Sequence, residues 1–408
     1  MGSFQGKFYQ EQLSNGLTLI GEQRDTAVST AIGFFVRTGA RDESQEVSGV
    51  SHFLEHMMFK GTDKRSALDI TYDMGAIGAQ ANAYTSEEST VYYMAVLPEY
   101  LRDAMELLSD MMRPALAQEE FDVEKNVILE EIALYQDRPS FQLFEASLRE
   151  FFRNHPAGNS VLGTNASISA LKSEQMRTYF DSRYVASNII FVCTGKFDWS
   201  AVKSMVSEFC SSWPKGQAAR TYPQFAAQNS FKEISKQDLN RAHLCLMGVG
   251  PSAKEECRYD AEVLANILGD SVGSKLYWEL INKGLADTAS VGVDNMDGIG
   301  AAYSYVSCSP DKIEEISNIT KKTLNNPLNF SKEELERALN KIRTRLVLQS
   351  ESSMRRLMAV GNDWLFRQQY TTLEDQQKRY TKVNTASILE MSKTYNFEPK
   401  VEVRLLPA

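Results

Sequence analysis

Three residues of this chain have the types and the spacing of a metal site that activates water: His52, Glu55 and His56. In an α-helix of about 3.6 residues per turn, positions i, i+3 and i+4 share one face. Two neutral imidazoles one turn apart can bind one metal ion at about 2.0–2.1 Å, which suits zinc. Bound zinc lowers the pKa of water toward about 7, and a neighbouring carboxylate can take the proton as that water attacks a carbonyl. The motif therefore predicts zinc-dependent hydrolysis.

The alternative is a helix with two incidental histidines, and the histidine count argues against it. The chain has 4 histidines in 408 residues, and two of them flank Glu55 at metal-binding spacing. The order His-x-x-Glu-His is the inverse of the commoner zinc-protease pattern and is itself a protease signature. We therefore prefer the metal site.

These side chains converge only if the segment 51–62 forms a helix. Lys60 followed by Gly61 is typical of the end of such a helix. An apolar face beside the polar one, suited to packing on a sheet, consists of Val50, Phe53, Leu54 and Met57.

A zinc site with two histidines needs a third protein ligand and one open position. The segment 118–136 has the periodicity of a helix, and its apolar stripe consists of Phe121, Ile128, Ile132 and Tyr135. On a helical wheel Glu130 points away from that stripe, whereas Glu131 and Glu124 lie at its margin. We predict Glu131 as the third ligand and Glu124 as a carboxylate that orients a ligand. A charged helix edge without function is the alternative.

Strands are predicted on both sides of the motif. Residues 8–37 have the pattern of a β-hairpin or meander with a turn at Asn15-Gly16. The small-residue strand from Ala81 to Thr85 has two interpretations: an edge to which an extended peptide adds, or a strand packed tightly under a helix. Spacing alone favours the second.

The segments 52–62, 82–85 and 124–132 resemble the pitrilysin/insulysin superfamily of zinc peptidases. The likeness is strongest to its short-chain branch, with the β-subunit of the mitochondrial processing peptidase and bacterial relatives. The resemblance implies that His52, His56 and Glu131 bind zinc, that Glu55 is the general base, that Glu124 supports the site, and that Asn82 and Ala83 lie on the strand that pairs with substrate. It thus favours the edge interpretation of that strand.

The second half of the chain departs from the superfamily at two positions. The resemblance implies an Arg and a Tyr that hold the substrate carbonyl, and Ile281 and Asp287 stand there instead. The carbonyl partner would then come from another residue or from a partner subunit, or be missing.

Residues 214–229 lack regular periodicity and are predicted to link an N-terminal half, 1–213, that binds the metal to a C-terminal half, 230–408, that does not. The segment 242–252 resembles 30–40, and the helix expected near 259–268 has no histidine. We expect an α+β fold of two similar αβ halves, each a mostly antiparallel sheet backed by helices. The resemblance adds a clamshell arrangement, and it leaves His155 and His243 as structural residues.

Composition excludes several other functions. The net charge of −9 argues against binding of nucleic acid, and no apolar run approaches the roughly 18 residues needed to span a bilayer. Five cysteines without C-x-x-C spacing fit buried free thiols in a reducing compartment. The N-terminal stretch Met1–Phe8 has no secretory or myristoylation pattern, so a cytoplasmic protein without membrane contacts is expected.

These observations together predict a zinc metalloendopeptidase that hydrolyses extended or unfolded peptides. From the resemblance we expect a homodimer, or a heterodimer with a homologous subunit. The alternative is a non-catalytic peptide-binding or assembly subunit that needs a homologous partner for activity. Zinc-dependent hydrolysis of a non-peptide amide is a weaker third possibility.

Overall fold

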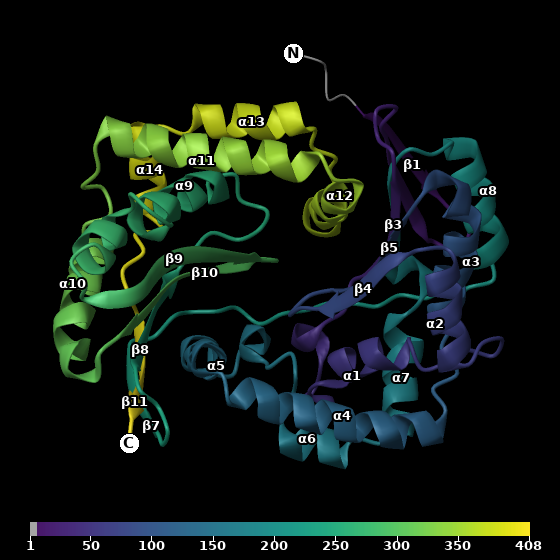
Figure 1. Ribbon diagram of the computed structural model, residues 1–408, viewed down its shortest axis with the longest axis horizontal. Helices are drawn as coiled ribbons and strands as arrows, with labels where there is room; N and C mark the ends of the chain where they lie inside the picture. The colour runs from purple at the N-terminus through teal and green to yellow at the C-terminus, as the bar shows by residue number, and fades with distance from the viewer. Residues whose placement is uncertain (1–5) are drawn as a thin grey trace. The chain divides into compact units, whose positions relative to one another are not determined.

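A computed structural model describes residues 6–408 of the chain (Figure 1). The prediction about Met1–Phe8 falls mainly on residues 1–5, which lie outside the described residues. The chain folds into two compact units, the first built from 6–133, 159–222 and 348–373, and the second from 134–158, 223–347 and 374–408. No helix among residues 6–408 is both long and apolar enough to cross a membrane.

The first unit contains a six-stranded mixed sheet with the order β1-β2-β6-β3-β5-β4. Its strands are β1 (Lys7–Gln12), β2 (Thr18–Gln23), β3 (Thr30–Val36), β4 (Gln80–Thr85), β5 (Thr90–Val96) and β6 (Ile189–Gly195). β2 and β6 run parallel, and the other neighbours are antiparallel. The predicted hairpin is confirmed for β1 and β2, which the Asn15-Gly16 turn joins; Gly16 has φ +98° there. β3 does not continue it, because β6 lies between β2 and β3.

The helices of the first unit are α1 (Val50–Met57), α2 (Ala67–Ala76), α3 (Leu101–Met111), α4 (Gln118–Gln136), α6 (Asn165–Ala170), α7 (Ser173–Arg183), α8 (Trp199–Cys210) and α12 (Ser353–Arg367). α1, α3, α8 and α12 pack directly on the sheet. α12 packs on the face that carries Phe35 and Val192, with Leu357 and Val360 in the same apolar core. The last residues of α4 belong to the second unit.

The second unit contains a five-stranded sheet with the order β7-β11-β8-β10-β9. Its strands are β7 (Ser230–Lys236), β8 (Ala242–Val249), β9 (Ala286–Met296), β10 (Ile299–Cys308) and β11 (Val401–Pro407). Its helices are α5 (Pro139–Phe152), α9 (Arg258–Gly269), α10 (Ile313–Asn325), α11 (Lys332–Ser350), α13 (Leu373–Lys382) and α14 (Thr385–Ser392). Short helical turns complete both units: η1 (Ala40–Asp42), η2 (Gln45–Val47), η3 (Pro98–Tyr100), η4 (Pro156–Gly158), η5 (Ala186–Asn188), η6 (Tyr277–Ile281) and η7 (Pro310–Lys312).

The two sheets repeat one pattern, which confirms the predicted α+β fold with two similar halves. In each, a parallel pair (β2 and β6, or β7 and β11) is followed by three antiparallel neighbours. α9 packs against the edge strand β9 as α1 packs against β4. The helix α9 thus occupies in the second unit the position that α1 occupies in the first, and it has no histidine.

One helix in each unit comes from the other half of the sequence. α5 follows α4 but packs on β8 and β11 of the second sheet, where Leu143 and Phe151 join the core of Met247 and Val403. α12 follows α11 but packs on β3 and β6 of the first sheet. The passage between units at 222 and 223 falls within the predicted linker, 214–229; the passages at 133, 158, 347 and 373 were not predicted.

The structure corrects the end of the helix predicted over 51–62. This helix, α1, ends at Met57 rather than at Gly61, and residues 58–60 form a turn. The extended backbone of Leu171 (ψ 136°) separates α6 from α7.

Candidate metal centre

The helix α1 carries His52, Glu55 and His56 and begins at a constrained backbone position. Gly49 precedes it with φ +91°, and a side chain there would meet the carbonyl oxygen of Leu162 at 2.7 Å. The carboxylate of Glu43 accepts hydrogen bonds from the N–H groups of Gly49 (2.7 Å) and Ser51 (2.8 Å). These hydrogen bonds satisfy N–H groups that have no partner within the helix.

The long helix α4 packs against α1 and brings the carboxylates to the histidines. The rings of Phe53 on α1 and Phe121 on α4 stack with centroids 4.7 Å apart. Phe121, Ile128 and Ile132 are buried, as the helical wheel predicted, and Glu130 is exposed. Glu131 and Glu124 therefore both face α1.

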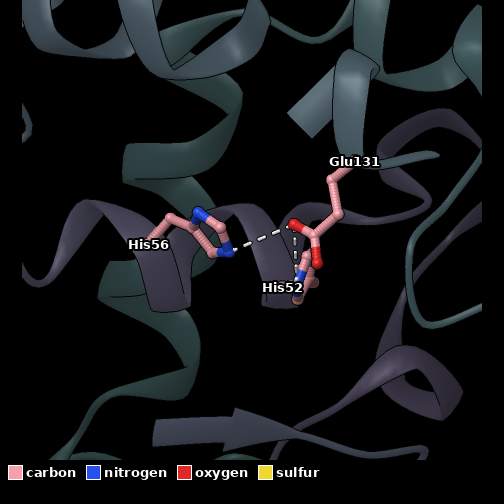
Figure 2. A group of neighbouring side chains, drawn as sticks. All are labelled: His52, His56 and Glu131. Atoms are coloured by element: carbon pink, nitrogen blue, oxygen red, sulfur yellow. Dashed lines mark ion pairs between the residues drawn. The ribbon is translucent and has the colours of Figure 1, made fainter. Parts of the chain in front are cut away.

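The side chains of His52, His56 and Glu131 point toward one another (Figure 2). Their ligand atoms all lie within 4.8 Å of one another. Glu131 Oε2 lies 3.8 Å from His52 Nε2 and 3.5 Å from His56 Nε2. The structure thus brings together the three residues predicted from spacing and the helical wheel.

This donor set fits zinc. Ligand atoms bound tetrahedrally at about 2.1 Å lie roughly 3.4 Å apart. The two distances from Glu131 to the histidines, 3.5 and 3.8 Å, are close to this value, and all three ligand atoms lie within 4.8 Å of one another. Two imidazoles and one carboxylate leave a fourth position open, which is the arrangement of catalytic rather than structural zinc sites. These three residues could hold the metal entirely within the first unit.

The electrostatic setting of His52 also suits a metal ligand. Burial, reinforced by the charge of His56, lowers the pKa of His52 to about 3. The ring is therefore neutral at physiological pH, as coordination requires. Its Nδ1 atom is buried and makes no hydrogen bond within residues 6–408.

The ring of His56 contacts a buried carboxylate, Glu124, which is itself paired with Lys60. Its Nδ1 lies 2.8 Å from Glu124 Oε1, and Lys60 Nζ lies 2.6 Å from Glu124 Oε2. Burial disfavours the imidazolium of His56, but the hydrogen bond to Glu124 and the nearby carboxylates outweigh it and raise its pKa. Burial of Glu124 is likewise outweighed by its hydrogen bonds to His56 and Lys60, which lower its pKa. A carboxylate that accepts from the outer nitrogen of a ligating histidine fixes the orientation of the ring.

Glu55 lies on the same face of α1 and is held by a residue of the sheet. Thr85 Oγ1, at the end of β4, donates a hydrogen bond of 2.6 Å to Glu55 Oε2. Burial raises the pKa of Glu55, while this hydrogen bond and the charge of His56 lower it in part. A carboxyl group with a raised pKa beside a metal site is suited to accept and return a proton.

Asn82 and Ala83 lie in β4, which is an edge strand of the first sheet. Among the described strands β4 pairs with β5 alone, so one side of its backbone is unpaired. Asn82 is exposed and Ala83 is half-buried. Such an edge can accept an added extended chain.

The remaining residues singled out from the sequence lie in the second unit. Ile281 ends the turn η6 and packs on the apolar core, and Asp287 in β9 forms an ion pair with Arg241. His155 Nε2 lies 3.1 Å from the carbonyl oxygen of Pro223, and His243 Nδ1 lies 2.9 Å from the Tyr305 hydroxyl. The five cysteines, which are distributed over both units, are free thiols, and four of them are buried.

Sequence reasoning missed three residues that support the site: Glu43, Lys60 and Thr85. Lys60 lies four positions after His56, a spacing that could have indicated a shared helix face. No local signal marks Glu43 or Thr85, because both reach α1 from other segments of the fold.

Residues 19–165 match the model of the family described as insulinase (peptidase family M16), and residues 170–342 match that of the peptidase M16 inactive domain. The chain is 31% identical over 366 residues to an uncharacterized zinc protease of Bacillus subtilis, covering 88% of this chain and 89% of the relative. It is 30% identical over 394 residues to an uncharacterized zinc protease of Rickettsia felis, covering 94% and 93%.

Solved structures show the same fold. A protease from Helicobacter pylori matches with a TM-score of 0.89 and 19% identity, covering 99% of this chain and 100% of that chain. A structure from Pseudomonas fluorescens, titled peptidase M16 inactive domain, matches with a TM-score of 0.92 and 16% identity, covering 98% of each.

Proposed function

The chain belongs to the insulinase family of peptidases, family M16, and from that premise we propose that it is a zinc-dependent metalloendopeptidase acting on extended or unfolded peptides. Membership in this family confirms the resemblance found in the sequence. The observation that carries the proposal is the convergence of His52, His56 and Glu131 from two packed helices. The two relatives described above share the words zinc protease in their names.

The residues of the site have separate roles in the proposed peptide hydrolysis. Zinc held by the three ligands would supply a Lewis acid that polarises the peptide carbonyl and makes water more acidic. Glu55 takes the proton of the attacking water and delivers it to the leaving amine, which is the role its raised pKa suits. Glu124 holds the ring of His56, so that Nε2 stays directed toward the ligand cluster.

The substrate class follows from the edge strand β4. A peptide in extended conformation can pair with the free side of β4 at Asn82 and Ala83 and thereby approach the site. Folded proteins present few free extended segments, so unfolded chains and peptides are the proposed substrates. The free thiols support a reducing, cytoplasmic location.

A second candidate function is a non-catalytic peptide-binding or assembly subunit. Ile281 and Asp287 stand where the superfamily has a carbonyl-binding Arg and Tyr, and this departure favours it. The same departure supports a proposal that activity requires a second copy of the chain or a homologous subunit.

The test is cleavage of a quenched fluorescent peptide of unfolded sequence by the full-length protein. We expect turnover that a chelator abolishes and zinc restores, and a loss of about 10²–10⁴-fold in kcat for Glu55→Gln with zinc still bound. Glu130→Gln, an exposed carboxylate on α4, is the matched control and should behave as wild type. Peptide binding without turnover, alone and with a homologous subunit, would favour the binding function.

A further inference from the structure

The general base proposed above is hydrogen-bonded to the strand proposed to receive the substrate. Thr85 Oγ1 donates to Glu55 Oε2 at 2.6 Å, and Thr85 is the last residue of β4. A carboxylate has two oxygens, and a hydroxyl bound to one of them restricts its rotation. Glu55 Oε1 is thereby left as the oxygen that can accept a proton from water.

The position of Thr85 is itself fixed by a rigid hairpin. Its partner across the β4–β5 pair is Thr90, which is buried and donates a hydrogen bond of 3.0 Å to the carbonyl oxygen of Thr38. In the turn between the strands, Ser86 N–H donates to the carbonyl oxygen of Ser89 at 2.8 Å. Thr85 therefore has little freedom to follow Glu55 if the carboxylate moves.

The loop that precedes α1 fastens this hairpin and the helix to each other. Arg41 forms a buried ion pair of 2.6 Å with Glu88, and its N–H donates to the carbonyl oxygen of Glu87 at 2.8 Å. Two residues later, Glu43 caps α1 through the N–H groups of Gly49 and Ser51. One short loop thus sets the distance between the helix that carries the base and the strand end that holds it.

The other residues on the same face of β4 offer no competing polar group. Side chains alternate along a strand, so Ala81 and Ala83 share the face of Thr85, whereas Tyr84 joins the core under α12 on the opposite face. On this face of β4 the hydroxyl of Thr85 is therefore the single side-chain donor available to Glu55.

We propose that Thr85 is a positioning residue for the reaction, which holds the Glu55 carboxylate in the orientation that accepts the proton of the attacking water. The inference rests on the proposed peptidase function. In this proposal the strand β4 both aligns the substrate peptide and orients the base Glu55. Because a misplacement of about 1 Å can cost about 10²-fold in rate, the hydrogen bond should matter for kcat rather than for binding.

The test uses full-length protein with Thr85→Val, which removes the donor at nearly constant shape, and Thr85→Ser, which keeps it. For Thr85→Val we expect kcat lower by about 10–100-fold, with KM, zinc content and Tm close to wild type. Thr85→Ser should restore kcat to within a few-fold. Thr320→Val makes the same chemical change at a buried hydroxyl of α10, in the second unit, and should keep kcat.

Each outcome decides the inference. A Thr85→Val protein with wild-type kcat overturns it, and so does a Thr85→Ser protein as slow as Thr85→Val. If Thr85→Val does not fold, Thr85→Ala takes its place and the comparison with Thr85→Ser stands. A wild-type protein without any turnover, both alone and with a homologous subunit, would instead refute the proposed function, and the inference with it, so the two failures are distinguishable.

Discussion

Replacing Glu124 with glutamine separates the charge of this carboxylate from its shape and tests its role in zinc binding. Glu124 is buried, with Oε1 2.8 Å from His56 Nδ1 and Oε2 2.6 Å from Lys60 Nζ. The amide oxygen of glutamine can still accept a hydrogen bond from Nδ1, but the negative charge that makes the His56 ring more basic is lost. Loss of such a partner typically costs about 10–100-fold in metal affinity, or about 1.4–2.7 kcal/mol. We expect the middle of that range, because the shape is kept while a buried charge is removed.

The effect should depend on pH in a defined direction. The raised pKa of His56 means that a proton competes with zinc for this ring as the pH falls. Glu124 stabilises both the zinc-bound ring and the imidazolium of His56. Its removal therefore weakens the binding of zinc and also the binding of the competing proton. The difference in affinity between wild type and Glu124→Gln should therefore be largest at high pH and should narrow as the pH falls.

The assay is a titration of metal-free, full-length protein with zinc against a competing chelating indicator, at about pH 8 and about pH 6, on either side of the ordinary histidine pKa. Glu130→Gln is the control, because it makes the same chemical change at an exposed position of the same helix. Equal zinc affinity of wild type and Glu124→Gln at high pH would refute the reasoning. An equal loss in Glu130→Gln would also refute it.

Two further predictions concern stability. Burial raises the pKa of Glu43 from 4.5 to about 7. Between these pH values the folded state binds more protons than the unfolded state, so the free energy of unfolding decreases as the pH rises. The decrease from this one group is at most about 3 kcal/mol. In chelator-treated protein the free energy of unfolding of wild type, relative to Glu43→Gln, should decrease from about pH 5 to about pH 8, and parallel curves would contradict the prediction. Arg356 forms a buried, bidentate ion pair with Glu22, so Arg356→Met should lower the free energy of unfolding in urea by about 3–5 kcal/mol. The exposed neighbour change Arg355→Met should be nearly neutral, and a similar loss in both would argue against a role for the buried pair.

The sequence was most informative where the chemistry follows from spacing along one helix. His52, Glu55 and His56 share a face because three or four residues make about one turn, and the apolar stripe of α4 oriented Glu131 and Glu124 in the same way. Both arguments need only the local geometry of a helix. They predicted which side chains share a face of each helix. That the two helices meet was inferred from the need of zinc for a third ligand and from the family resemblance.

Features that depend on contacts between distant segments could not be predicted. The insertion of β6 between β2 and β3 pairs residues far apart in the chain, and strand periodicity carries no information about neighbours. The hydrogen bond of Thr85 to Glu55 needs a strand end and a helix face to meet in space.

Because α12 comes from a later part of the sequence than the strands it covers, it affects when the first unit can fold during synthesis. The face of the first sheet that carries Phe35 and Val192 is covered by α12, which ends at Arg367 of 408 residues. A ribosome must therefore translate the chain as far as Arg367 before the strands of the first sheet obtain their covering helix. Until then the nascent chain presents an open apolar surface, and it should depend on chaperones or on the speed of elongation to avoid aggregation.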